Sequence, residues 1–219
     1  MISLSNSSLG LYVECPRCFW LRFNKKINRP AGIFPTLPSG MDLIIKEYFN
    51  RYRDKGILPP LVQGKLPGKL ANVSLNLKYT DEELGIRITG KLDECLELED
   101  GRLVPLDHKT KGSLPTGVEY SQNYYQRQMD TYSLLLEKCG HQTKREAYLI
   151  YYSPSAGELH EGIPFKIAVH RVETNPQNVR ETFRDAKECL VGEIPASGPE
   201  CGFCNWKRSI NGLEDFSPE

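Results

Sequence analysis

The sequence predicts an α/β protein in which a mixed central sheet is flanked by helices. Two observations predict this class. Apolar side chains repeat at helical spacing in some segments and alternate or run continuously in shorter ones. Along the chain these segments are ordered as helices, three strands, one helix, one or two more strands and a last helix. Strands and helices in this order pack as a sheet with helices against it.

Length and composition fit one soluble domain. The 219 residues are 39% hydrophobic and 26% charged, and the 28 basic side chains balance the 28 acidic ones. A dedicated coating protein for nucleic acid would be strongly basic, whereas neutrality permits an enzyme with a local basic channel. Because no apolar run is long enough to span a bilayer and the first residues lack a signal-peptide pattern, we expect no membrane contact and a cytoplasmic location.

The N-terminal part is expected to be helical with long loops. Ser5–Ser8 offers capping side chains for a first helix. Apolar residues at helical spacing predict a second helix over Met41–Arg53, with Asp42, Lys46 and Arg53 on its exposed face. The prolines and glycines of 28–40 and 56–71 predict loops before and after it.

The stretch from 86 to 109 is expected to form a hairpin. Residues 86–93 and 103–109 are the two predicted strands, and Asp100-Gly101 supplies the turn between them. Pairing of these strands would bring Asp93, at the end of the first, beside Asp107 in the second.

Asp107 and Lys109 are two residues apart in a strand, so their side chains share a face while His108 points the other way. The hairpin therefore gathers two carboxylates and one ammonium. Paired carboxylates are oxygen ligands for a hard cation such as Mg²⁺ or Mn²⁺. A lysine beside them can orient or deprotonate water, or stabilise charge on a phosphate.

The remaining elements follow the hairpin. A helix is expected over Tyr120–Cys139 and is closed by Gly140. Strands are expected over Ala147–Tyr152 and Phe165–Val172. Asn175-Pro176 begins a last helix, and the tail from Gly192 has the composition of a loop.

Cysteine spacing predicts a metal centre. Seven cysteines without a signal peptide do not indicate a disulfide framework. Four of them form two Cys-x-x-Cys pairs near the two ends of the chain: Cys15, Cys18, Cys201 and Cys204. We expect these four thiolates to bind one centre between them, and such a set is standard for tetrahedral zinc.

The chain resembles the PD-(D/E)XK nuclease superfamily. Asp93 and Asp107-His108-Lys109 match its motif of an acid followed by (Asp/Glu)-x-Lys on the next strand. Gln128 and Tyr132 match the Gln-x-x-x-Tyr motif of RecB-like members, and residues four apart lie on one helix face. The cysteine-bearing ends resemble the CRISPR-associated branch, in which early and late cysteines hold a [4Fe-4S] cluster.

The resemblance implies a metal-dependent deoxyribonuclease, most simply an exonuclease acting on single strands or strand ends in DNA processing, repair or CRISPR spacer acquisition. Asp93 and Asp107 would bind Mg²⁺ or Mn²⁺ with the backbone carbonyl of His108. Lys109 would activate water, and Gln128 and Tyr132 would contact the substrate or support the site. Partners would be DNA and other proteins of a CRISPR adaptation complex.

The same resemblance implies one nuclease domain over 1–219, with a core at about 39–172 and a cysteine-bearing lobe from 1–38 and 173–219. Two departures from the pattern stand out. Relatives often carry a metal-binding histidine on the helix before the hairpin, which this sequence lacks. Many also divide their cluster cysteines one and three, whereas this chain has two and two, so zinc remains the alternative to the [4Fe-4S] cluster.

Basic residues in the early segment predict a path for nucleic acid. They are Arg17, Arg22, Lys25 and Lys26, with Trp20 and Phe23 available for stacking. A solvated helix face is the alternative for this charge cluster.

Two other functions remain open from the sequence. One is a zinc- or cluster-bound DNA-binding module, whose activity would not need Asp107 or Lys109. The other is a catalytically weak or inactive nuclease fold that serves as a subunit of a larger complex.

Overall fold

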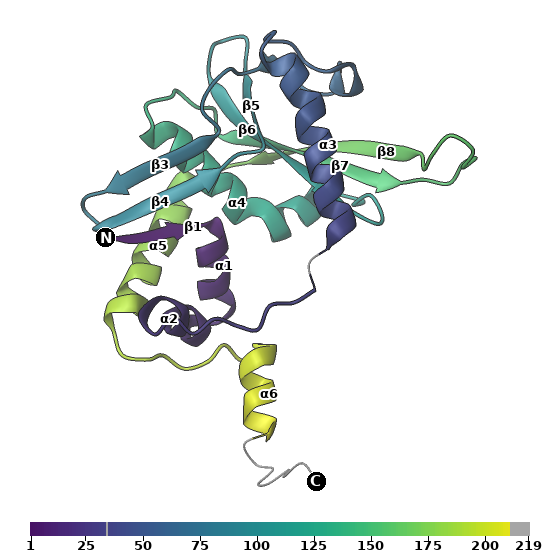
Figure 1. The fold of residues 1–219 in the computed structure, drawn as a ribbon. Coiled ribbons are helices and arrows are strands. Elements are labelled where there is room, and N and C mark those ends of the chain that lie inside the picture. Colours follow the sequence, from purple (N-terminus) through teal and green to yellow (C-terminus); the bar gives the residue numbers. More distant parts are fainter. Residues whose placement is uncertain (34, 211–219) are drawn as a thin grey trace.

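The computed structural model describes residues 1–33 and 35–210. Its helices are α1 (Asn6–Glu14), α2 (Pro16–Asn24), α3 (Thr36–Arg53), the 3₁₀ turn η1 (Pro60–Val62), α4 (Val118–Lys138), α5 (Pro176–Val191) and α6 (Gly202–Ile210). Its strands are β1 (Ile2–Ser5), β2 (Lys69–Leu70), β3 (Asn76–Asp81), β4 (Ile86–Lys91), β5 (Glu94–Glu97), β6 (Leu103–Thr110), β7 (Glu146–Pro154) and β8 (Phe165–Glu173). Figure 1 shows their arrangement.

The strands form two sheets. The larger has the order β2-β5-β6-β7-β8, in which β6 and β7 are parallel and the other pairs antiparallel. The smaller has the order β1-β4-β3, with β1 parallel to β4. The predicted class, an α/β protein with mixed sheets flanked by helices, is therefore confirmed.

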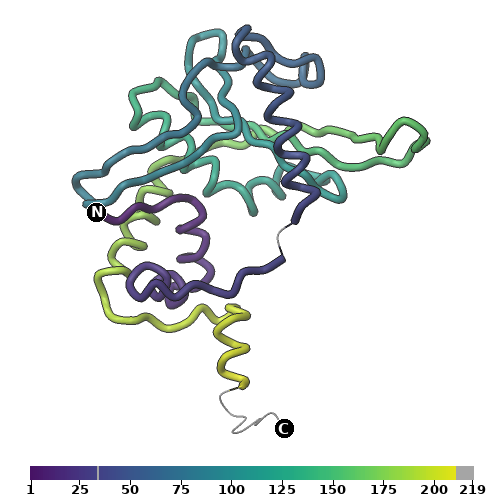
Figure 2. Tube along the Cα trace, viewed as in Figure 1, coloured from purple at the N-terminus to yellow at the C-terminus, as the bar shows by residue number. Residues whose placement is uncertain are grey.

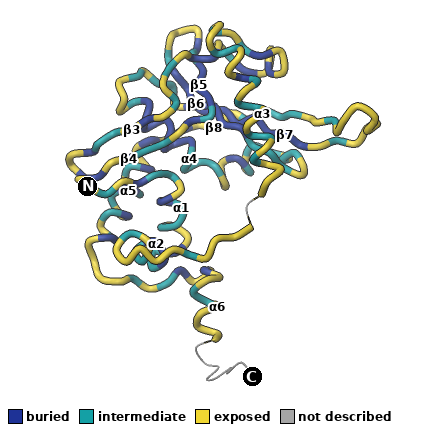
Figure 3. The backbone as a smooth tube through the Cα atoms, viewed as in Figure 1, coloured by how far each residue is buried: buried dark blue, intermediate teal, exposed yellow. Residues whose placement is uncertain are grey.

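Helices cover both faces of the larger sheet. Leu149 and Tyr151 of β7 belong to the apolar cluster that includes α4 and α5, whereas Ile150 and Tyr152 belong to the cluster beneath α3. Successive side chains of a strand point to opposite faces. Thus α3 and α4 lie on opposite sides of the sheet, and the buried strands between them form the interior of the molecule (Figures 1 and 3).

The N-terminal segment packs beside the C-terminal part of the described chain. Ser5 caps α1 by a reciprocal hydrogen-bond pair with Ser8, as its hydroxyl predicts. Helices α1 and α2 then lie next to α5 and the segment that leads to α6 (Figure 2). The strand β1 also joins the first residues to β4.

Three expectations need correction. The predicted strand 86–93 contains only β4, which belongs to the smaller sheet, and the hairpin with β6 is made instead by β5, which follows it in the sequence. The helix α3 begins at Thr36, within the predicted loop 28–40, and not at Met41. Pro38 is tolerated there because it falls in the first turn, where a missing backbone N–H costs no helical hydrogen bond. The tail after Gly192 contains the helix α6.

The helix α4 ends as predicted. Gly140, just beyond it, has φ of +92°. This left-handed backbone suits glycine, because a side chain there would be strained.

Candidate functional site

The β5–β6 register brings the two predicted carboxylates together. Glu94 pairs with Leu106, so Asp93, directly before β5, lies opposite Asp107. The backbone N–H of His108 donates to Oδ2 of Asp93 at 3.1 Å. The predicted approach of Asp93 to Asp107 is therefore present, although Asp93 belongs to the connection between β4 and β5.

The α4 side of β6 holds Asp107 and Lys109. Their side chains form an ion pair. Gln128 bridges them, because its Nε2 donates to Oδ1 of Asp107 at 2.9 Å and its Oε1 accepts from Nζ of Lys109 at 3.0 Å. The ring of Tyr125 lies 4.5 Å beneath the Lys109 ammonium. This lysine is thus oriented by three side chains.

Tyr132 faces Gln128 as the spacing of four predicts. Nε2 of Gln128 lies 2.9 Å from the Tyr132 hydroxyl, which donates to the backbone oxygen of Lys91 at 3.0 Å. Tyr132 is buried. The pair therefore links α4 to the residues just before Asp93 and holds the site together.

Burial and crowding disfavour a second negative charge. Burial raises the pKa of Asp107 to about 7; the neighbouring Asp93 adds to the rise and Lys109 opposes it. For Asp93, hydrogen bonds from Lys46 and the His108 backbone outweigh burial and lower the pKa. A divalent cation between the two would remove their repulsion, so this donor set fits Mg²⁺ or Mn²⁺.

Lys46 is a site residue that the sequence did not reveal. Its Nζ lies 2.9 Å from Oδ1 of Asp93 and 2.8 Å from Asp42, which is one turn earlier in α3. In the sequence, Asp42 and Lys46 look like an ordinary surface pair, so the prediction that Lys46 is exposed was wrong. The helix that lacks the histidine of related proteins presents this ammonium to Asp93.

The α3 side of β6 supports the site from behind. The imidazole of His108 packs 4.5 Å from the ring of Phe49, and its Nδ1 lies 3.1 Å from the Tyr152 hydroxyl. Burial lowers the pKa of His108 to about 4, so the ring stays neutral. Arg53, predicted to be exposed, instead forms a bidentate pair with the fully buried Glu94 at 2.5 and 3.0 Å.

The four predicted cysteines come together where the start of α2 lies beside the start of α6. Sγ of Cys18 lies 3.7 Å from both Cys201 and Cys204, and Sγ of Cys15 lies 3.8 Å from Cys204. All four sulfurs lie within 4.8 Å of one another. The three other cysteines, 95, 139 and 189, lie elsewhere.

Hydrogen bonds favour the thiolate form at Cys15 in particular, whereas burial raises the pKa of Cys18 and Cys204. Burial raises the pKa of Cys15, but backbone N–H groups of Cys18 and Gly198 outweigh it and lower the pKa to about 7. Arg29 donates to Sγ of Cys201 at 3.3 Å. A Cβ on Gly198 would lie 2.2 Å from the backbone oxygen of Glu14, so only glycine lets the two segments approach this closely.

The four basic residues predicted to form a path for nucleic acid do not all lie together. Arg17 lines a cavity next to the cysteines, and Arg22 lines a different, smaller one. Lys25 and Lys26 are exposed. The aromatic partners have structural roles: Trp20 donates to the backbone oxygen of Gly192 at 3.0 Å, and Phe23 packs on Phe19. Contact of the four cations with nucleic acid stays a prediction.

Among the helices of the described residues, none combines the length and the apolar character that a membrane crossing requires.

No curated protein matches the chain. Eighteen chains of known structure match. One, titled "Crystal structure of SSO0001", is 14% identical, with 94% of this chain and 84% of that one covered and a TM-score of 0.46.

A sequence model of the PD-(D/E)XK nuclease superfamily matches residues 61–209, which is more than half of the chain. The match includes Asp93, Asp107, Lys109, Gln128 and Tyr132. The chain belongs to the PD-(D/E)XK nuclease superfamily.

Proposed function

We propose that this protein is a metal-dependent deoxyribonuclease of the RecB-like type that acts on single strands or strand ends. Its superfamily consists of nucleases that cut phosphodiester bonds with divalent metals. The observation that carries the proposal is the joint placement of Asp93, Asp107 and Lys109, of which Gln128 bridges the last two. A role in CRISPR adaptation, with protein partners, rests on the resemblance of the cysteine-bearing ends alone.

The residues divide into ligands and supports. Asp93 and Asp107 would bind the cation, with the carbonyl of His108 as a further ligand. The bound cation would stabilise negative charge on the phosphate and lower the pKa of its water. Lys109 points its ammonium along the same face and would orient the attacking water. Gln128 and Tyr132 would act as positioning residues, because each is already engaged within the protein.

A cleavage assay tests the proposal. End-labelled single-stranded and double-stranded DNA would be incubated with the purified chain, with and without Mn²⁺. We expect cutting that needs Mn²⁺ and that falls by ~10²-fold or more in Asp107→Asn and Lys109→Met, as for groups that act in the transition state. Glu158→Gln, in the exposed loop between β7 and β8, is the matched control. Unchanged cutting by Asp107→Asn would refute the assignment.

A second candidate is a nuclease fold that binds partners but cuts weakly or not at all. The ion pair between Lys46 and Asp93 favours this candidate, because the Lys46 ammonium contacts the carboxylate that would otherwise bind the metal. A chain that binds DNA without cutting it under any divalent metal would support this candidate.

For the cysteine centre we propose a single zinc ion. Four thiolates that share one tetrahedral zinc lie about 3.8 Å apart, since each Zn–S bond is about 2.3 Å long. The closest sulfur pairs here are 3.7 to 3.8 Å apart, which supports a single ion. In a [4Fe-4S] cluster each thiolate binds a different iron, so the cysteine sulfurs lie farther apart than four thiolates around one ion.

Metal analysis of anaerobically purified protein distinguishes the two centres. Zinc predicts a colourless protein with about one zinc per chain. The [4Fe-4S] cluster that the resemblance favours predicts brown protein with equal amounts of iron and sulfide. A folded protein with neither would remove the centre from the proposal.

A further inference from the structure

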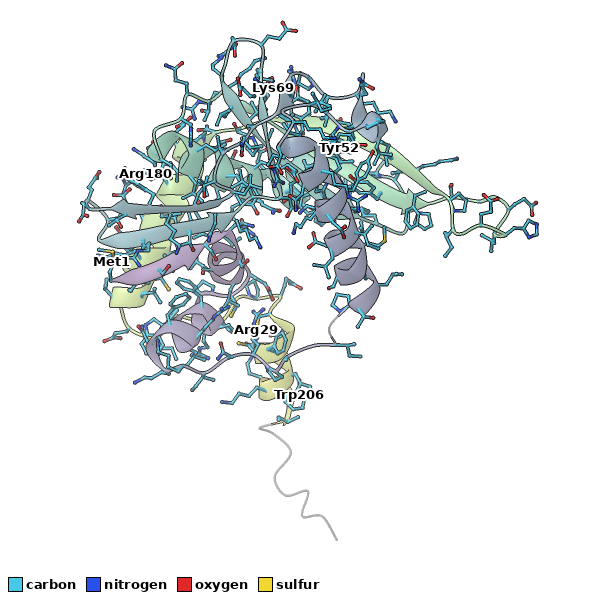
Figure 4. The ribbon with its side chains drawn as sticks, turned by 45° about the horizontal axis from the view of Figure 1, so that its top comes forward. Met1, Arg29, Tyr52, Lys69, Arg180 and Trp206 are labelled. Atoms are coloured by element: carbon cyan, nitrogen blue, oxygen red, sulfur yellow. The ribbon has the colours of Figure 1, made fainter. Side chains whose placement is uncertain are left out.

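A cavity of about 530 Å³ lies beside the cysteine centre, between α2, the segment after it and α6. Among the residues that line it are Arg17, Arg29, Phe203, Trp206, Lys207 and Arg208. Figure 4 shows Arg29 and Trp206 beside α6, at the end of the molecule away from the sheets. The cavity is separate from the carboxylate site, because no residue of that site lines it.

The helix α6 has an apolar face that is largely exposed. Phe203, Trp206 and Ile210 follow one another at spacings of three and four, so they lie on one side of the helix. They are 43%, 67% and 38% exposed, and no residue of α6 is buried. Large aromatic side chains grouped on a solvent-exposed face are typical of a ligand-binding or interaction surface.

The charge around these aromatic rings is of one sign. Four lining residues are cationic, and none of the lining residues is acidic. Arg29 is already engaged by Glu14 and Cys201. Arg17 and Arg208 each use one guanidinium nitrogen within the protein, so their remaining nitrogens and the ammonium of Lys207 are left to meet a ligand. By contrast, the cavity beside Arg180 is lined by four acids. The chain as a whole has zero net charge, so this cavity is a local concentration of positive charge.

We propose that this cavity binds single-stranded nucleic acid, with a base stacked on Trp206 and phosphates held by Lys207, Arg208 and Arg17. Aromatic faces stack on any base, and cations beside them follow the backbone. The proposal takes its ligand class from the proposed function but names a second site outside the carboxylate pair. The concave shape distinguishes it from a membrane-binding helix, in which cations and aromatic rings occupy opposite faces.

The cysteine centre would fix the geometry of this site. Phe203 lies between Cys201 and Cys204 in sequence, and Cys18 and Cys204 both line the cavity. The guanidinium of Arg29 lies 4.8 Å from the Phe203 ring while it donates to Cys201. The metal would therefore hold α6 against α2 with its aromatic side chains toward the cavity.

Binding measured without cutting tests the proposal. The full chain, with its cysteine metal in place, would be titrated with a fluorescent oligo(dT) in buffer free of Mg²⁺ and Mn²⁺ but without chelator, which would strip that metal. We expect Trp206→Ala to weaken binding roughly 5- to 150-fold, the loss that one stacked base implies. Trp206→Phe should restore most of the affinity.

The cations have their own readout. Lys207→Ala with Arg208→Ala should reduce the slope of log affinity against log salt by about 1.4, because each phosphate contact on a single strand contributes about 0.7. The matched control is Lys55→Ala with Lys65→Ala, two exposed cations between α3 and β2, neither of which lines this cavity. Trp206 is one of two tryptophans, so oligonucleotide-induced quenching that disappears in Trp206→Phe would report the stacking directly.

Unchanged affinity in Trp206→Ala together with an unchanged salt slope would overturn the proposal, whether or not the chain cuts DNA. Two other results would also overturn it. Loss of binding to anionic vesicles, with oligonucleotide affinity intact, would assign α6 to a membrane surface. A change of oligomeric state alone would assign it to a second copy of the chain.

Discussion

The carboxylate site and the cysteine centre both gather charged ligands, but different parts of the structure hold them in place. Asp107 lies in a buried strand, Asp93 is fixed by strand register, and Lys46 and Lys109 neutralise them. The cysteines come from two segments that are 183 residues apart at Cys18 and Cys201: Cys15 and Cys18 belong to the start of α2, and Cys201 and Cys204 to the start of α6, which has no buried residue. The first site is therefore built by the fold, whereas the second would depend on the metal that we propose for it.

The largest expected effect is loss of the cysteine centre. Cys18→Ser removes a ligand from a structural site whose apparent binding free energy is ~10 kcal/mol or more. We expect loss of the metal, a lower unfolding temperature and faster hydrogen exchange in α2 and α6, with the β5–β6 pairing still protected. Cys139→Ser, at an exposed thiol, is the control. Retained metal with unchanged exchange in α6 would break the comparison.

Next in size is the internal ion pair behind the carboxylate site. Arg53→Met leaves the buried Glu94 without its partner, and removing one member of a buried pair costs roughly 3 to 5 kcal/mol. Arg51→Met, two residues earlier in α3, breaks a pair with Glu47 whose members are 67% and 71% exposed and should cost about 0 to 1 kcal/mol. Urea unfolding measures both. Equal costs would show that the fold does not depend on its internal charges.

A third prediction concerns pH in buffer without Mg²⁺ or Mn²⁺ and without chelator. Because burial raises the pKa of Asp107 to about 7, the folded state keeps a proton that the unfolded state releases near pH 4. Stability should therefore fall as pH rises from about 4 to 7, by up to about 1.4 kcal/mol per pH unit. Asp107→Asn should remove this slope in urea unfolding at pH 5, 6 and 7.

Asp81 supplies the contrast for that experiment. Hydrogen bonds from Arg180 and Leu84 outweigh burial and lower its pKa, so its stabilisation is present above its unfolded pKa and is lost only as pH falls through the lower, folded value. Asp81→Asn should leave the slope between pH 5 and 7 as it is. A slope that persists in Asp107→Asn would assign the titration to another group.

The smallest expected effect is at Lys46. Its ammonium competes with a cation for Asp93, so Lys46→Met should bind Mn²⁺ about fivefold more tightly, which corresponds to about 1 kcal/mol. Calorimetric titration with Mn²⁺ measures this, and Lys55→Met is the control. Weaker binding in Lys46→Met would mean that the lysine positions Asp93 for the metal instead of occupying its place.

The local sequence pattern was enough to place most of the carboxylate site. Alternation in a strand put Asp107 and Lys109 on one face, and helical spacing put Gln128 beside Tyr132. The spacing of two Cys-x-x-Cys pairs likewise predicted that four cysteines would meet. Such patterns determine which side chains share a face, because the repeat of a strand or helix is fixed by its backbone.

Only the tertiary structure decided which element covers each face. Lys46 and Arg53 have the spacing of a solvated helix surface, yet α3 turns them toward Asp93 and Glu94. Residues 86–93 read as one strand that pairs with β6, but β4 ends at Lys91 within the smaller sheet, and the pairing with β6 begins only at Glu94 in the larger sheet. The helix α6 was not predicted from the sequence, and the structure shows it next to the cluster of four cysteines. Contacts between distant segments depend on how whole elements pack, and no repeat within a single element encodes that packing.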